Sequence, residues 1–260
     1  MSVVEIIMAA QETKEELLYK KRFIELANTA YFKEYAVFTD FLNLNEQSVF
    51  LETVRELPKI NFFMWGGAKH TERKMICFSC EKIDTENFPL SVIKVSPIQV
   101  KFAENLSHRD YLGALMNLGI ERCKIGDIWL HEKSAYVFVD STLKEYISQE
   151  LTKVRHTSVR CVDVEEDFSY EQQYEELVGT VSSIRLDTLI TMAFQGSRSN
   201  LIQHIAARKV FVNSKLTTSN GYSINPGDII SVRGMGKFIF QEELGVSKKG
   251  KIKVILRKYM

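Results

Sequence analysis

The sequence predicts an α+β protein with a helical N-terminal part, a mixed middle part and a basic C-terminal part. Its 260 residues exceed the length of one typical compact domain and suit two or three. Apolar residues recur at helical spacing in some segments and at strand spacing in others. Lysine and arginine are concentrated toward the C-terminus. We place the three parts at residues 1–90, 91–165 and 180–260.

The composition excludes several classes of protein. Hydrophobic residues make up 45% and charged residues 26%, which is ordinary for a globular protein in water. No apolar run approaches the roughly eighteen residues that a membrane span requires, and the first residues lack the pattern of a signal peptide. The four cysteines are too few and too scattered for a disulfide framework. We therefore expect a reduced, cytoplasmic protein with no membrane partner.

The formal net charge of +1 hides an asymmetry along the chain. Residues 181–260 hold 13 Lys or Arg against 4 Asp or Glu, a balance of +9, which leaves 21 basic and 29 acidic residues, or −8, for the rest. A basic third on an acidic body predicts an anionic partner at that end. Just before it, residues 163–176 carry seven carboxylates and no basic residue, which suits either an acidic strand or a linker.

The N-terminal part reads as two helices followed by two strands. Residues 12–30 lack Gly and Pro and repeat apolar residues at helical spacing. A second helix is expected at 45–57, with Asn45 as its N-cap and Pro58 as its end. Strands are expected at 60–68, closed by the Gly66-Gly67 turn, and at 74–80.

The middle part follows the order strand, helix, strand, strand, helix, strand. The segments are 91–98, 106–119, 126–132, 134–140, 141–151 and 158–164. Ser107 and Ser141 are placed to cap the two helices, and Gly119 to stop the first. This order is that of a ferredoxin-like split βαβ unit, which RNA-recognition motifs also use.

An RNA-recognition motif also carries an aromatic signature on one strand. Here the strand SAYVFVD places Tyr136 and Phe138 on one face, but the Gly and basic residue that should precede them are missing. Packing or protein contact is therefore favoured over RNA contact for this sheet, although both remain open.

The C-terminal part begins with two short helices. The first starts near Ser183, and Ser197 caps the second after a break at Gly196. Leu201, Ile205 and a half-buried His204 are expected on the inner face of the second helix. A strand at 209–215, turns at 219–221 and 225–228, and a strand at 229–234 follow. The alternating basic tail at 248–253 suits an edge strand.

These residues resemble the S4 family of RNA-binding domains. The family pattern is met by Arg185-Leu186-Asp187, Ser197-Arg198, Val210-Phe211-Val212-Asn213 and Gly227-Asp228, in the expected order over about sixty residues. Two positions depart from it, because Arg208 and Ser214 stand where the family has Gly. A residue other than Gly in a left-handed conformation costs on the order of 1 kcal/mol.

The pattern is physically suited to RNA. Arg198 lies in the first turn of a helix, where backbone N–H groups and the helix dipole favour a phosphate. Guanidinium groups bind phosphate bidentately or stack on unpaired bases. Other cations can surround Arg198 if the two helices pack on the strands, and Asn213 can bond a ribose, a base or its own turn. The expected RNA-binding residues are Arg185, Ser197, Arg198, Arg208, Lys209, Asn213, Lys215, Arg233 and Lys237.

The whole chain resembles the YlmH type of S4-domain protein from Gram-positive bacteria. The resemblance is carried by FTDFLNLNEQ, FMWGGAKHTERK, VSSIRLD and SVRGMGKF. It implies a non-catalytic RNA binder, encoded near cell-division genes, and we expect the protein to be a monomer. It further implies rRNA and tRNA as partners on the large ribosomal subunit, and a role in rescue of stalled nascent chains.

Other chemistry finds little support. Cys77 and Cys80 form a C-x-x-C, but no second pair completes a zinc site, and in a strand the two would point to opposite faces. The five histidines show no metal-binding spacing. We expect no metal and no cofactor.

Two alternatives remain open. The first is an RNA-modifying enzyme with an appended S4 domain. The only R-L-D is the S4 one, which makes Asp187 a structural residue, and no Gly-rich methyltransferase turn is present. The second is a cell-division interaction protein whose S4 domain no longer binds RNA.

Overall fold

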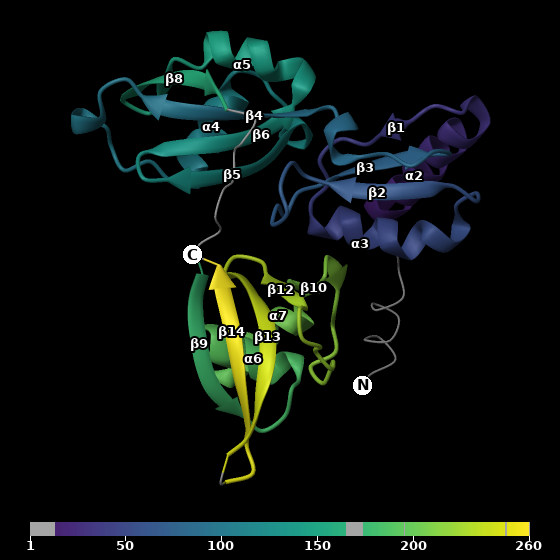
Figure 1. The fold of residues 1–260 in the computed structure, drawn as a ribbon, viewed down its shortest axis with the longest axis vertical. Helices are drawn as coiled ribbons and strands as arrows, with labels where there is room; N and C mark the ends of the chain where they lie inside the picture. Colours follow the sequence, from purple (N-terminus) through teal and green to yellow (C-terminus); the bar gives the residue numbers. More distant parts are fainter. Residues whose placement is uncertain (1–13, 165–173, 195, 248, 260) are drawn as a thin grey trace. The chain divides into compact units, whose positions relative to one another are not determined.

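The computed structural model describes residues 14–164, 174–194, 196–247 and 249–259. The chain forms two compact units, residues 1–168 and 169–260 (Figure 1). Both units combine helices with antiparallel sheets, so the predicted α+β class is confirmed. The parts predicted at 1–90 and 91–165 fall together in the first unit. Within the described ranges, no helix is both long and apolar enough to cross a membrane.

The N-terminal part of the first unit is a small sheet covered by two helices. Helices α2 (Lys14–Lys33) and α3 (Leu44–Thr53) pack on one face of a sheet with the order β1-β3-β2. Its strands are β1 (Val37–Phe38), β2 (Asn61–Trp65) and β3 (Met75–Ser79). A 3-10 turn, η1 (Val54–Glu56), follows α3. The predicted helices and strands are present here, with ends shifted by a few residues.

The predicted cap of α3 is wrong by two positions. Asn43, not Asn45, is the N-cap, because its side chain accepts hydrogen bonds from the backbone N–H groups of Asn45 and Glu46. The Glu46 carboxylate in turn accepts from the Asn43 N–H at 2.6 Å. This reciprocal capping box satisfies donors that the first turn of a helix cannot pair internally.

The middle part has the predicted order of elements with one short strand, β7, added between α5 and β8. Its sheet runs β5-β6-β4-β8-β7, and every neighbouring pair is antiparallel. The elements are β4 (Leu90–Pro97), α4 (His108–Asn117), β5 (Ile125–His131), β6 (Ser134–Asp140), α5 (Lys144–Glu150), β7 (Lys153–Val154) and β8 (Thr157–Asp163). Short 3-10 turns lie at η2 (Thr85–Asn87), η3 (Val100–Phe102), η4 (Arg122–Lys124) and η5 (Ser141–Leu143). Alternate strand residues form one core with α4 and α5.

Two of the three predicted helix signals in this part are confirmed. Ser107 is the N-cap of α4, and Gly119 follows its end with a φ of 81°, a conformation that glycine adopts without strain. Ser141 is not a cap. The side chain of Asp140 takes that place by accepting a hydrogen bond from the Thr142 N–H at 3.0 Å. A carboxylate at the end of a strand thus starts the following turn.

Buried contacts join the two parts of the first unit. Strand β3 is buried at all five residues, because α2 and α3 cover one face while Met75 and Cys77 pack with Phe138 of β6 on the other. Gly67 permits this approach: a Cβ there would lie 2.4 Å from a Phe138 ring carbon, and its φ is 100°. One end of the middle sheet is therefore covered by the N-terminal part.

Hydrogen bonds also join the N-terminal and middle parts of the first unit. Asp127 accepts hydrogen bonds from the backbone N–H groups of Glu72 at 2.6 Å and Arg73 at 2.9 Å. The Arg73 guanidinium donates to the carbonyls of Phe41 at 2.7 Å and Ile125 at 2.9 Å. Burial lowers the pKa of Arg73, yet these acceptors compensate for the desolvation of its charge.

The second unit is a six-stranded antiparallel sheet with two helices on one face. Its strand order is β11-β10-β12-β13-β14-β9. The elements are β9 (Tyr174–Val181), α6 (Leu186–Phe194), α7 (Arg198–Ala206), β10 (Val210–Val212), β11 (Lys215–Leu216), β12 (Ile229–Val232), β13 (Gly236–Val246) and β14 (Ile252–Tyr259). Apolar residues of both helices and of alternate strand positions form its core. Ser197 caps α7 as predicted, and His204 is half-buried.

Two predictions about strands in this unit are wrong. The strand expected at 209–215 is a hairpin, because Asn213 and Ser214 turn the chain between β10 and β11 with φ values of 50° and 67°. The basic tail does not form an edge strand. Residues 249–251 lie in the connection between β13 and β14, and β14 pairs on both sides, with β13 and β9. The alternation of Lys251, Ile252 and Lys253 arises because Ile252 packs against the core, as Val254 and Leu256 do further along β14.

The acidic stretch at 163–176 is described only at its ends. Asp163 closes β8, and Glu175 and Glu176 lie on β9 opposite Lys258 and Arg257 of β14. Residues 165–173 lie outside the described ranges. Opposite charges face each other across this strand pair, an arrangement that favours the antiparallel pairing.

Candidate nucleic-acid interface

Asp187 of α6 fixes two predicted RNA-binding arginines. Its side chain is 2% exposed and accepts hydrogen bonds from Arg185 Nε at 3.2 Å and Arg198 Nη2 at 2.6 Å. The two arginines remain 45% and 59% exposed. A guanidinium has five N–H donors, so each arginine can donate to Asp187 and still present donors to solvent. The sequence predicts that Asp187 is structural, and in the structure its buried carboxylate positions both arginines.

A turn from a distant part of the chain completes this arrangement. The backbone N–H of Leu186 donates to Tyr222 O at 2.9 Å, and that of Asp187 donates to Asn220 O at 3.2 Å. The Arg185 guanidinium lies over this turn, 3.7 Å from where a Cβ of Gly221 would stand. Tyr222, whose carbonyl takes part in this turn, is 43% exposed. No local pattern in the sequence pointed to Tyr222, because its position depends on these backbone bonds.

Ser197 and Arg198 lie at the start of α7, and Arg198 brings this helix end to Asp187. The Ser197 hydroxyl accepts a hydrogen bond from the Asn200 N–H at 3.4 Å. Arg198 is the first residue of the helix, so its cation stands where the N–H groups of the first turn also favour an anion.

A second group of cations lies past the other end of α7. Arg208 and Lys209 follow the helix, and the Lys209 carbonyl accepts a hydrogen bond from the Arg233 N–H at 2.8 Å. All three side chains are exposed. Arg208 has a φ of 56°, the left-handed conformation that the resemblance implied. Nine residues of helix separate this corner from Arg198, which is about 14 Å.

Asn213 is engaged by its own turn. Its Nδ2 donates to Asp228 Oδ1 at 2.8 Å, and its Oδ1 accepts from the Ile229 N–H at 2.9 Å. Asp228 also accepts from the Asn225 N–H at 2.7 Å. Of the three partners considered for Asn213, the structure shows its own turn. The exposed Lys215 follows this turn directly.

Lys237 lies on the other face of the sheet. Phe238 and Phe240 of β13 face the helices, so Lys237 points away from them, where its Nζ lies 4.4 Å from the centre of the Tyr259 ring. Of the expected cations, Arg185 joins Arg198 at Asp187, whereas Arg208 and Lys209 lie past the other end of α7 and Lys237 lies on the opposite face of the sheet.

The C-x-x-C motif shows no binding geometry. Cys77 is buried, and burial raises the pKa of its thiol to about 11, whereas Cys80 is exposed just beyond β3. Among the described residues, no three His, Cys, Asp or Glu side chains gather as metal ligands.

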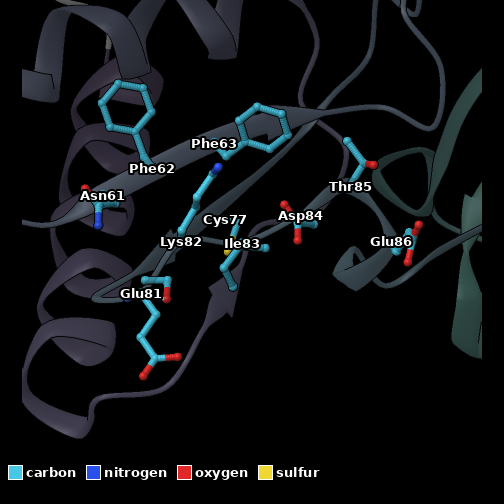
Figure 2. A pocket seen from close by; sticks show the side chains of 11 residues that line it. Asn61, Phe62, Phe63, Cys77, Glu81, Lys82, Ile83, Asp84, Thr85 and Glu86 are labelled. Atoms are coloured by element: carbon cyan, nitrogen blue, oxygen red, sulfur yellow. Dashed lines mark hydrogen bonds between the residues drawn. The ribbon is translucent and has the colours of Figure 1, made fainter.

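A groove beside β2 and β3 has the wrong charge for RNA. Figure 2 shows Phe62 and Phe63 above it and several charged side chains along it. Its volume is about 730 Å³. Its charged side chains are three carboxylates and one lysine: Glu81, Asp84, Glu86 and Lys82. This excess of negative charge repels phosphate.

Comparisons with known proteins cover most of the chain. Residues 84–167 match the family described as "Putative RNA-binding domain in YlmH". The chain is 29% identical over 221 residues to "Ribosome-associated protein quality control protein P2" of Bacillus subtilis (strain 168), covering 83% of this chain and 84% of the relative. A solved structure, "Cell division protein ylmH from Streptococcus pneumoniae", matches 60% of this chain and 94% of its own, with 19% identity and a TM-score of 0.49. The family match and the Bacillus relative confirm the predicted resemblance to YlmH-type proteins.

Proposed function

We propose that this protein is a non-catalytic RNA-binding protein whose C-terminal unit is an S4-type domain that holds structured RNA. The observation that carries the proposal is the Asp187 arrangement, which fixes Arg185 and Arg198 while leaving both exposed. Fixed guanidiniums lose less side-chain entropy on binding phosphate than free ones. The surplus of positive charge in residues 181–260 adds long-range attraction for RNA.

The RNA is proposed to be rRNA or tRNA on the large ribosomal subunit. Support comes from the Bacillus relative, whose name describes a ribosome-associated quality control protein. By extension, the present chain acts in the cytoplasm, as a monomer, in the rescue of stalled nascent chains. The middle part is proposed to be a ferredoxin-like domain, on the strength of its strand order.

Reversing charge at exposed cations tests the proposal without disturbing Asp187. The double variant Lys209→Glu with Lys215→Glu changes two exposed side chains of the second unit. The matched control, Lys21→Glu with Arg22→Glu, makes a similar change on exposed residues of α2. We expect the first pair to abolish co-sedimentation with large ribosomal subunits at moderate salt and the second to leave it unchanged.

Salt dependence provides an independent measure. Removing one phosphate-binding cation should flatten the slope of log affinity against log salt by nearly one unit, since each neutralised phosphate releases about one counterion. Equal co-sedimentation of the two double variants, or a flat salt response of the unaltered protein, would overturn the assignment to RNA.

A further inference from the structure

The middle sheet has one face that its helices do not cover. Side chains of alternate residues point away from α4 and α5. The strand register places Tyr136 of β6 between Trp129 of β5 and Lys94 of β4. The Lys94 Nζ lies 5.5 Å from the centre of the Tyr136 ring. An aromatic ring on this face is thus bordered by a second aromatic ring and a cation.

The N-terminal part covers only one end of this face. Phe138, on the same face as Tyr136, is fully buried against Met75 and Cys77. Beyond it, Tyr136 and Trp129 are only partly buried. The surface that remains, here called the Tyr136 strip, consists of Trp129, Tyr136, Lys94, Val162, His131, Ser134, Ser96, Arg160, Ser158 and Lys153.

The charge of the Tyr136 strip is positive. Lys94, Lys153 and Arg160 belong to it, and Lys153 and Arg160 are exposed. None of its ten residues is Asp or Glu. The nearby Asp163 has the opposite parity on β8 and pairs with Lys144 at 2.9 Å. A positive surface of this kind attracts a polyanion, whereas the groove beside β2 repels one.

We propose that the Tyr136 strip binds an unpaired stretch of RNA. Bases of single-stranded RNA stack on aromatic side chains, whereas those of a duplex are already stacked and paired. In this arrangement a base stacks at Tyr136 with Trp129 beside it, and Lys94 and Arg160 neutralise flanking phosphates. The hydroxyls of Ser96 and Ser134, 3.1 Å apart, supply neutral hydrogen-bonding groups between them.

This proposal goes beyond the function proposed for the second unit. The cations of that unit suit the backbone of folded RNA, whereas the Tyr136 strip requires exposed bases. Two chemically different RNA contacts on one chain would let it recognise a site where a duplex adjoins an unpaired segment.

Titration of the full-length protein with single-stranded oligouridine tests the proposal. Tryptophan fluorescence reports stacking near Trp129. Tyr136→Ala should weaken binding about tenfold, the loss expected for one stacked base, whereas Tyr136→Phe should keep it. The matched control is Tyr146→Ala on α5, which removes a tyrosine that is 44% exposed on the helix layer. It should bind like the unaltered protein.

A second variant keeps the test decisive if Tyr136→Ala fails to fold. Arg160 is exposed, so Arg160→Glu preserves the fold, and it should weaken oligouridine binding and flatten its salt dependence. If Arg160→Glu and a folded Tyr136→Ala both bind oligouridine like the unaltered protein, the proposal fails and a protein partner becomes the better occupant. If Tyr136→Phe weakens binding as much as Tyr136→Ala, stacking is also refuted.

Co-sedimentation and fluorescence titration together separate this inference from the proposed function. Lys209→Glu with Lys215→Glu should abolish large-subunit co-sedimentation while an oligouridine-dependent fluorescence change remains. Tyr136→Ala should move the fluorescence change to about tenfold higher oligouridine concentration while the second unit still binds folded RNA. Loss of both interactions in either variant would contradict two separate RNA contacts.

Discussion

Arg198 Nη2 lies 2.6 Å from Asp187 Oδ2, and the Asp187 side chain is 2% exposed. The arginine is thus a structural partner of a buried carboxylate as well as a candidate RNA contact. Substitutions at Arg185 or Arg198 act on the fold and on the interface together. Variants of these residues must therefore be judged on stability before they are judged on binding.

The double variant Arg185→Glu with Arg198→Glu should destabilise the second unit. It would surround a buried carboxylate with like charges, and removing the partners of a buried charge alone costs about 3 kcal/mol. Arg198→Lys should cost on the order of 1 kcal/mol, because a cation stays near Asp187. The decrease in hydrogen-exchange protection of α6 measures the destabilisation in both variants. Unchanged protection in the double variant would show that Asp187 does not need its partners.

Ser214→Gly should stabilise the second unit by about 1 kcal/mol. Ser214 has a φ of 67° in the two-residue turn between β10 and β11, and Asn-Gly is the preferred pair for such turns. The expected result is a higher melting temperature and unchanged RNA affinity. Ser214→Ala is the control, because it retains a side chain at the same φ and should give no gain. Equal effects of Gly and Ala would exclude backbone strain as the cause.

Gly67→Ala should destabilise the first unit by about 2 kcal/mol. A Cβ at Gly67 would lie 2.4 Å from the ring of Phe138, and the φ of 100° is unfavourable for alanine. The same substitution at Gly113, inside α4 with no atom within 4 Å of the added Cβ, should be stabilising by up to about 1 kcal/mol. Thermal unfolding compares the two. A neutral Gly67→Ala would mean that the two parts of the unit can separate at little cost.

Asp140 should make the first unit sensitive to acid. Burial acts to raise the pKa of Asp140, but hydrogen bonds from Thr142 and Lys124 outweigh it, so the folded-state pKa is lowered from 3.8. Its contribution to stability is present above the unfolded value and lost as pH falls through the lower folded value. Asp140→Asn should remove this part of the acid dependence in a series of melting temperatures. Asp163→Asn, at a side chain that is 73% exposed, should not.

Local signals predicted much of the fold. Ser197 was identifiable as a cap because capping depends on residues within one helical turn. The left-handed conformations of Arg208 and Ser214 followed from positions where the S4 pattern has Gly. The split of residues 209–215 into two strands was missed, because Asn-Ser is a weaker turn signal than Asn-Gly.

Long-range contacts explain the other features of the structure that the sequence did not predict. Strand periodicity placed Tyr136 and Phe138 on one face, but nothing local indicated that Phe138 would be covered next to Gly67, about seventy residues earlier in the sequence. The bond between the Asp127 carboxylate and the Arg73 N–H likewise joins residues 54 positions apart. Such pairings decide which part of a surface stays accessible, and hence which residues a partner can reach.

The bonds from Arg73 to Phe41 and Ile125, together with the burial of Phe138, set a limit on where the chain can be cut. A fragment beginning at residue 84, where the family match begins, would retain Phe138 and Trp129 but lack Phe41, Met75 and Cys77, which pack in the same cluster. Its bare aromatic surface would favour self-association. The smallest autonomous piece that carries the middle sheet is therefore longer than the segment by which sequence comparison recognises it.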